Sequence, residues 1–81
     1  MRLDKYLKLS RLIKRRTVAS DACDASRVDV NGKPAKPSYR VKVGDIITVS
    51  FGTKQVKIRV LSIDEHTTKE SAALMYEEIA E

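Results

Sequence analysis

The feature that most constrains the fold of this chain is a change in the spacing of its apolar residues near position 27. Before that position, Leu3, Tyr6 and Leu7 recur at helical spacing, and a second helical pattern follows. The second pattern consists of Val18, Ala19, Ala22, Cys23 and Ala25. After that position, apolar and polar residues alternate, as in strands with one buried face. The sequence therefore predicts an α+β fold in which two N-terminal helices pack on a small antiparallel sheet.

Turn signals divide the alternating part of the chain into strands. Val28 and Val30 precede Asn31-Gly32, a dipeptide typical of a two-residue hairpin turn. Residues 46–51 are predicted to form a further strand, and Gly52-Thr53 is the turn before a last one. The last strand carries the alternating residues Val56, Ile58, Val60 and Ile63. Short turns of this kind join antiparallel neighbours.

The end of the chain is predicted to be a helix that packs back on the rest. Thr67 and Glu70 have the spacing of a capping box. The apolar face of this helix would consist of Ala72, Met75, Tyr76 and Ile79. Because 81 residues leave room for one domain only, we expect a domain over residues 1–63, with an acidic loop and helix over residues 64–81 packing on it.

Several classes of protein are disfavoured by the sequence. No stretch approaches the roughly 20 apolar residues that cross a bilayer, so we expect a cytoplasmic protein. Cys23 is predicted to be a reduced, buried core thiol. The run Asp64-Glu65-His66 lacks a further His or Cys to complete a metal site. Without a phosphate-binding glycine loop or a nucleophile paired with a base, we expect no enzymatic activity, cofactor or metal.

Basic residues are concentrated at the start of the chain. Residues 1–20 hold seven Lys and Arg against the single acid Asp4, whereas residues 64–81 hold six acids against Lys69. The net charge is +5. This asymmetry favours a polyanionic partner that meets the N-terminal half, with an ordinary solvated surface as the alternative.

Arg15 and Arg16 fall at or just before the start of the second predicted helix. The positive end of the helix dipole lies there, so a cation is unfavourable by up to about 1 kcal/mol. Arginine side chains beside free backbone N–H groups form a phosphate site, which would turn this placement to advantage. Asp4 falls in the first turn of the first helix, where we expect a structural role.

Several residues within the first 50 positions occur in a characteristic order. They are Arg2-Leu3-Asp4, Leu7, Leu12, Arg16, Ala19, Val28 to Gly32, Pro37-Ser38-Tyr39, Val41, Gly44-Asp45 and Ile47. This order resembles the RNA-binding domain family named after small-subunit ribosomal protein S-four, and it implies such a domain over residues 1–63. The family holds RNA across its helix pair and the adjoining loop. Three residues depart from the pattern: Arg15 stands where many members have a serine cap, and Arg11 and Ser26 stand where glycine is common.

The resemblance implies an RNA-binding surface on the N-terminal segment. Its residues are Arg2, Lys5, Arg11, Lys14, Arg15 and Arg16, with Lys8, Lys33 and Lys36 as additional contacts. Among stand-alone members, the chain is most similar to short bacterial factors of ribosome-associated quality control, which are related to heat-shock protein fifteen. This similarity implies a monomer that binds large ribosomal subunits obstructed by peptidyl-tRNA. It would contact ribosomal RNA and tRNA, and support the factor that adds alanine tails to stalled nascent chains.

Other functions stay open at this point. Two short helices with basic residues also describe a DNA-binding helix-turn-helix protein. A general ribosomal RNA-binding heat-shock or assembly factor, and an adaptor acting through the acidic end, are further alternatives. Lys33 and Lys36 are also explained as edge-strand charges that discourage aggregation. Tyr6 and Tyr39 are predicted to pack in the core, with stacking on RNA bases as the alternative.

Overall fold

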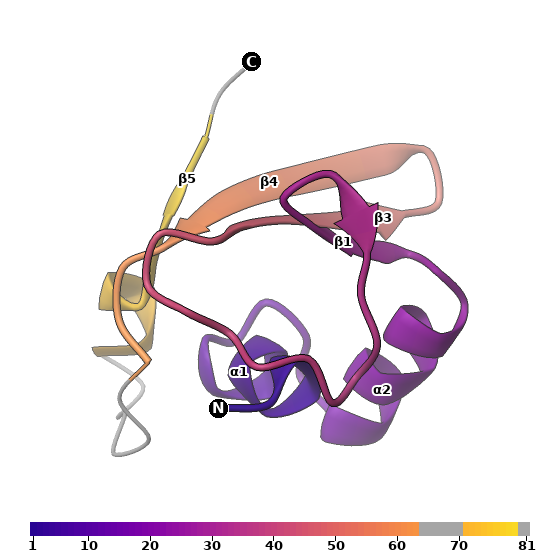
Figure 1. Cartoon of the computed structure of the whole chain (residues 1–81), viewed down its shortest axis with the longest axis horizontal. Coiled ribbons are helices and arrows are strands. Elements are labelled where there is room, and N and C mark those ends of the chain that lie inside the picture. The colour runs from indigo at the N-terminus through magenta and orange to yellow at the C-terminus, as the bar shows by residue number, and fades with distance from the viewer. Residues whose placement is uncertain (64–70, 80–81) are drawn as a thin grey trace.

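The computed structural model describes residues 1–63 and 71–79 (Figure 1). Two helices come first, α1 (Leu3–Leu9) and α2 (Arg16–Asp24). The strands are β1 (Val28–Val30), β2 (Lys33–Pro34), β3 (Ile46–Phe51), β4 (Lys54–Val60) and β5 (Tyr76–Glu78), and a short 3-10 helix, η1 (Ser71–Leu74), precedes β5. The predicted α+β class, with a helix pair and an antiparallel sheet, is confirmed. None of the helices in the described ranges has the length and apolar character needed to cross a membrane.

The strands form one antiparallel sheet in the order β2-β1-β3-β4-β5. The turn from β1 to β2 has φ angles of 53° at Asn31 and 84° at Gly32, as the predicted hairpin turn requires. The pairing of β3 with β4 runs from Ile46 opposite Arg59 to Phe51 opposite Lys54. The predicted hairpins are therefore confirmed, although Ile63 lies beyond the end of β4.

Both helices pack against the same face of the sheet, and the apolar core lies between them and the strands (Figure 1). Leu3, Tyr6 and Leu7 of α1 are fully buried, as their helical spacing predicted. The sheet contributes alternate residues of β3 and β4, namely Ile47, Val49, Ile58 and Val60. The hydroxyl of Tyr6 donates a 2.7 Å hydrogen bond to the main-chain oxygen of Met75, which ties α1 to the segment before β5.

Cys23 is a buried core thiol, as predicted. Burial, together with the negative charges of Asp4 and Asp24, raises the pKa of its thiol to about 11. Val18 was predicted to lie on the same inner face but is 50% exposed, because α2 buries only the face that carries Ala19 and Cys23.

The predicted C-terminal helix is wrong for the residues that the structure describes. After η1, the chain forms β5, which pairs with β4 from Ile58 opposite Glu78 to Val60 opposite Tyr76. So short a helix is marginal in water, whereas the edge of β4 offers a row of backbone groups that a strand satisfies. The proposed capping box of Thr67 and Glu70 lies outside the described residues. The apolar pattern still reflects burial, because two of its members, Ala72 and Met75, are in the core.

Both helices are followed by a non-glycine residue in the left-handed conformation. Arg11, after α1, has φ of 64°, and Ser26, after α2, has φ of 58°. The N–H of Arg11 donates to the carbonyl of Lys8 at 3.1 Å, and that of Ser26 donates to the carbonyl of Cys23 at 3.0 Å. This C-cap geometry favours glycine, and a side chain there is strained by about 1–2 kcal/mol. The two departures from glycine in the family pattern therefore fall where the backbone adopts a conformation that favours glycine.

Candidate nucleic-acid interface

One buried carboxylate holds two of the predicted RNA-binding arginines at the same point. Asp4, in the first turn of α1, has a side chain that is only 5% exposed. Arg2 donates to it twice, from Nε to Oδ1 and from Nη2 to Oδ2, each at 3.2 Å. The Nε atom of Arg16 lies 3.6 Å from Oδ2 of the same carboxylate. Each arginine side chain is 48% exposed, so both stay accessible to a further anion.

The contact with Asp4 corrects the sequence-based account of Arg16. That account needed an external anion to offset the unfavourable position of Arg16 at the start of α2. The structure supplies an anion from α1 instead. The positive electrostatic potential at the start of α2 is nevertheless only partly neutralised. Arg15 at the N-cap forms no side-chain hydrogen bond to the free N–H groups there, and the first turn contains no acid.

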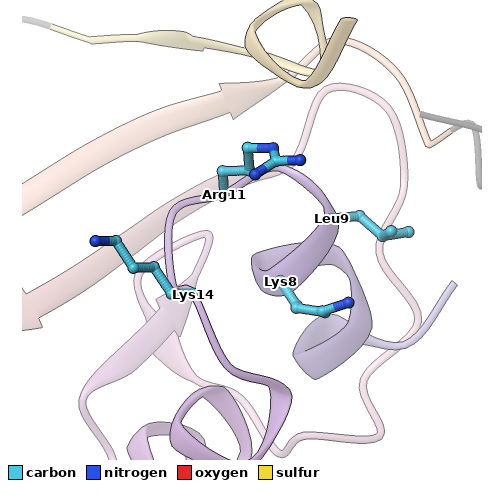
Figure 2. Close-up of a pocket in the computed structure, with 4 residues that line it drawn as sticks. All are labelled: Lys8, Leu9, Arg11 and Lys14. Carbon is cyan, nitrogen blue, oxygen red and sulfur yellow. The ribbon is translucent and has the colours of Figure 1, made fainter. Parts of the chain in front are cut away.

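A second group of cations surrounds the turn after α1. A pocket of about 460 Å³, called here the cationic pocket, is lined by Lys8 and Leu9 from the end of α1 and by Arg11 and Lys14 from the connector. Figure 2 shows these four side chains spread around that turn. The three cations are exposed, and the lining residues include no acid. Such a surface suits a phosphate group.

Of the remaining predicted residues, Arg15 lies next to the first group, and the others lie apart from both groups. Lys5 is partly buried on α1 and does not line the cationic pocket. Arg15 is exposed beside Arg16 at the start of α2. Lys33 and Lys36 line a different pocket beside β2. The predicted surface is therefore divided into three places.

The segment after β2 runs along the start of α1. The N–H of Leu3 donates to the carbonyl of Tyr39 at 2.8 Å, and the N–H of Asp4 donates to that of Pro37 at 3.2 Å. An isolated antiparallel bridge also joins Arg2 to Arg40, which brings a further cation beside Arg2.

Sequence reasoning missed the pairing role of Asp4 and the place of Tyr39. The available signal for Asp4 was its isolation as the one acid among seven cations in residues 1–20. Tyr6 is buried in the core as predicted, and base stacking by it is ruled out because no part of it is exposed. Tyr39 is only partly buried, and its hydroxyl donates to Asp45 at 2.9 Å.

The outer face of α2 argues against a helix-turn-helix protein. A recognition helix presents polar and basic side chains to the groove of DNA. On α2, Arg16 and Thr17 are exposed at the start, but the exposed residues further along the helix include Val18, Asp21 and Asp24. Two exposed carboxylates on this helix would repel the phosphates on either side of the groove.

The run Asp64-Glu65-His66, considered as a metal site, lies outside the described residues. In the ranges that are described, no group of three or more His, Cys, Asp or Glu side chains is placed to hold a metal ion.

Comparison with known proteins gives consistent matches. The sequence model of the S4 domain family matches residues 1–47. A protein of Streptococcus pneumoniae named RQC P-site tRNA stabilizing factor is 53% identical over 81 residues, which cover 100% of this chain and 92% of the relative. A Bacillus subtilis protein of the same name is 54% identical over 76 residues, covering 94% and 88%.

The fold also matches a solved structure. Heat Shock Protein 15 of Vibrio cholerae, described as trimeric, superposes with a TM-score of 0.91 at 33% identity. The match covers 99% of this chain and 82% of that one. The predicted resemblance to this group of proteins is confirmed.

Proposed function

We propose that this chain, which belongs to the S4 domain family, is an RNA-binding factor that acts on large ribosomal subunits obstructed by peptidyl-tRNA. The observation that carries the proposal is the placement of cations on the helix pair. Arg2 and Arg16 meet at Asp4, and the cationic pocket is formed by the turn between the same two helices. The printed name of the relatives, which refers to a P-site tRNA, supports tRNA as one of the bound RNAs.

The Asp4 pair explains how the surface would bind RNA with little reorganisation. Guanidinium groups form directional, bidentate bonds to phosphate, and fixing them in advance lowers the entropy lost on binding. Arg2 is fixed by two hydrogen bonds before RNA arrives, while Arg16 is held more loosely at 3.6 Å. In our proposal these arginines position the RNA backbone, and Lys5, Lys8, Arg11, Lys14 and Arg15 add phosphate contacts.

The proposed role is binding, without a chemical step. By contacting ribosomal RNA and tRNA together, the protein would hold the peptidyl-tRNA in place while a partner factor adds alanine residues to the stalled chain. This role would place the protein in the cytoplasm. We propose that residues 1–63 carry the RNA contacts and that residues 71–79 serve the stability of the same domain, since Met75 and β5 belong to its core and sheet.

A second candidate is a more general ribosomal RNA-binding factor of the heat-shock type, which the structural match to Heat Shock Protein 15 favours. The two candidates differ in what they need on the ribosome. A quality-control factor should prefer large subunits that carry peptidyl-tRNA, whereas a general factor should bind empty subunits equally well. We propose a monomer, and sedimentation equilibrium at micromolar concentration would test this against the trimer described for the Vibrio protein.

Competition binding tests the proposed RNA preference. Structured ribosomal RNA or tRNA should displace a labelled RNA from this protein more effectively than duplex DNA of equal charge. Arg2→Ala should weaken RNA binding, whereas Lys54→Ala, at the β3–β4 turn and outside the cation groups, should have little effect. Equal competition by DNA and RNA would overturn the proposal. The adaptor alternative would instead be supported if Glu78→Gln, on β5, impaired ribosome binding while Arg2→Ala did not.

A further inference from the structure

A second pocket lies beside β2, separate from the cationic pocket at the turn after α1. Its volume is about 400 Å³. It is lined by Val30, Lys33, Pro34, Ala35, Lys36, Ser38 and Tyr39. This volume lies within the range of pockets that hold small molecules.

The lining combines an apolar surface with an aromatic ring. Val30, Pro34 and Ala35 supply carbon surface, Tyr39 supplies the ring, and Ser38 supplies a hydroxyl. The ring of Tyr39 is anchored, because its hydroxyl donates to the carboxylate of Asp45 at 2.9 Å. An anchored ring beside apolar surface suits a flat heterocycle, as in proteins that stack unpaired bases on aromatic side chains.

The charge around this pocket is positive. Lys33 and Lys36 are both exposed, and neither forms an ion pair with another of the described residues. The carboxylate of Asp45 is engaged, since it accepts from Tyr39, from the side chain of Asn31 and from the N–H of Lys42. Asp29, opposite Pro34 in the hairpin, alternates with Val30 and so faces the other side of the sheet. A ligand in this pocket should therefore carry a negative group beside its flat ring.

The pocket is linked to the start of α1 through main-chain hydrogen bonds. Its wall at Ser38 and Tyr39 belongs to the segment that hydrogen-bonds to the start of α1, and Figure 1 shows this segment passing α1. The carbonyl of Tyr39 accepts from Leu3, the residue between Arg2 and Asp4. A strand whose phosphate is held by Arg2 and Arg16 would thus reach the pocket with a neighbouring nucleotide.

We propose that this pocket receives one unpaired nucleobase of the bound RNA, stacked against Tyr39, while Lys33 and Lys36 hold an adjacent phosphate. The inference rests on the proposed RNA-binding function and adds a base-binding subsite to it. Since stacking tolerates every base, the subsite would select for an unpaired nucleotide and not for a particular sequence.

Adenosine monophosphate is a suitable probe, because it joins a base to a phosphate. In amide NMR spectra of the isotope-labelled full chain, it should shift the signals of Val30, Ala35 and Tyr39. Adenosine should shift the same signals with lower affinity. Inorganic phosphate at equal concentration should leave them largely unchanged. If phosphate reproduces the full effect, or if the monophosphate shifts only signals near Arg2 and Arg16, the base subsite is wrong.

Substitutions distinguish the contribution of the Tyr39 ring from that of the two lysines. Tyr39→Phe keeps the ring and should retain the adenosine shifts, whereas Tyr39→Leu should weaken monophosphate binding by about tenfold. Lys33 and Lys36 are exposed, so replacing either with alanine should leave the fold intact. Lys33→Ala and Lys36→Ala should each lower the affinity for the monophosphate by up to about fivefold and leave the affinity for adenosine unchanged. Lys54→Ala is the matched control. Unchanged monophosphate binding in both lysine variants would overturn the phosphate contact.

The inference and the proposed function fail in different ways. If the wild-type protein binds large subunits but the monophosphate does not bind in the pocket, the proposed base subsite is wrong and the proposed function stands. If the pocket binds the monophosphate but the protein ignores large subunits and structured RNA, the proposed function is wrong.

Discussion

Replacing Arg11 with glycine should make the protein more stable and a weaker RNA binder. Arg11 has φ of 64°, and Ser26 provides a matched site at 58° that lies outside the cation groups. Removing the side chain relieves about 1–2 kcal/mol of strain in the folded state. The added conformational freedom of glycine in the unfolded chain destabilises the fold by about 0.5–1 kcal/mol and so offsets part of this gain. Both Arg11→Gly and Ser26→Gly should therefore gain about 0.5–1 kcal/mol. For a chain of this size the gain corresponds to a rise in Tm of about 2–8 °C.

RNA binding should distinguish the two variants. Arg11 lines the cationic pocket with Lys8 and Lys14, so Arg11→Gly should lose one phosphate contact. The slope of log affinity against log salt should fall in magnitude by roughly 0.7–0.9, whereas Ser26→Gly should keep the wild-type slope. Thermal unfolding and salt titrations of RNA binding measure both effects. The reasoning is refuted if Ser26→Gly destabilises the protein, or if Arg11→Gly binds RNA as the wild type does.

Three further predictions concern binding and the core. Arg16→Ala should prevent co-sedimentation with large subunits. It should change the free energy of unfolding by less than about 1 kcal/mol, because loss of the half-exposed ion pair with Asp4 is offset by relief of repulsion from the helix dipole. Normal sedimentation of this variant would show that the RNA binds elsewhere. RNA affinity of the wild type should fall by several log units per decade of salt, as about five phosphate contacts require, and a flat response would contradict an electrostatic interface. Because the folded pKa of Cys23 is about 11, above its ordinary value of 9.0, stability present below pH 9 should be lost as the pH rises through 11. Urea unfolding at pH 8 and pH 11 measures this loss: between these pH values, the free energy of unfolding of Cys23→Ala should fall by roughly 2 kcal/mol less than that of the wild type. Identical falls in the two proteins would show that the thiol does not contribute.

The parts of the fold with strong local signals could be predicted from the sequence. The helical spacing of Leu3, Tyr6 and Leu7 specifies the buried face of α1, and Asn31-Gly32 specifies the hairpin, because each depends on residues adjacent in the chain. The segment after Met75 could not be predicted in this way. Its spacing fits a helix, but its conformation is decided by the free edge of β4, which lies far away in the sequence.

The candidate site shows the same division. The position of Arg16 at the start of α2 follows from the local pattern, and the structure confirms it. Its pairing with Asp4 depends on how α1 packs against α2, so no spacing rule reveals it. Similarly, Tyr39 had an apolar pattern typical of core residues, and only the path of the chain beside β2 places it at a pocket with Lys33 and Lys36.

Sedimentation through a sucrose gradient tests the central claim most directly. The tagged wild-type protein would be mixed at physiological salt with purified large subunits carrying peptidyl-tRNA, with empty large subunits and with intact ribosomes. The account predicts that the protein travels with the peptidyl-tRNA-bearing large subunits in preference to the other two, and that Arg2→Ala abolishes this association while Lys54→Ala does not. Equal association with all three particles, or retention of the Arg2→Ala variant, would contradict it.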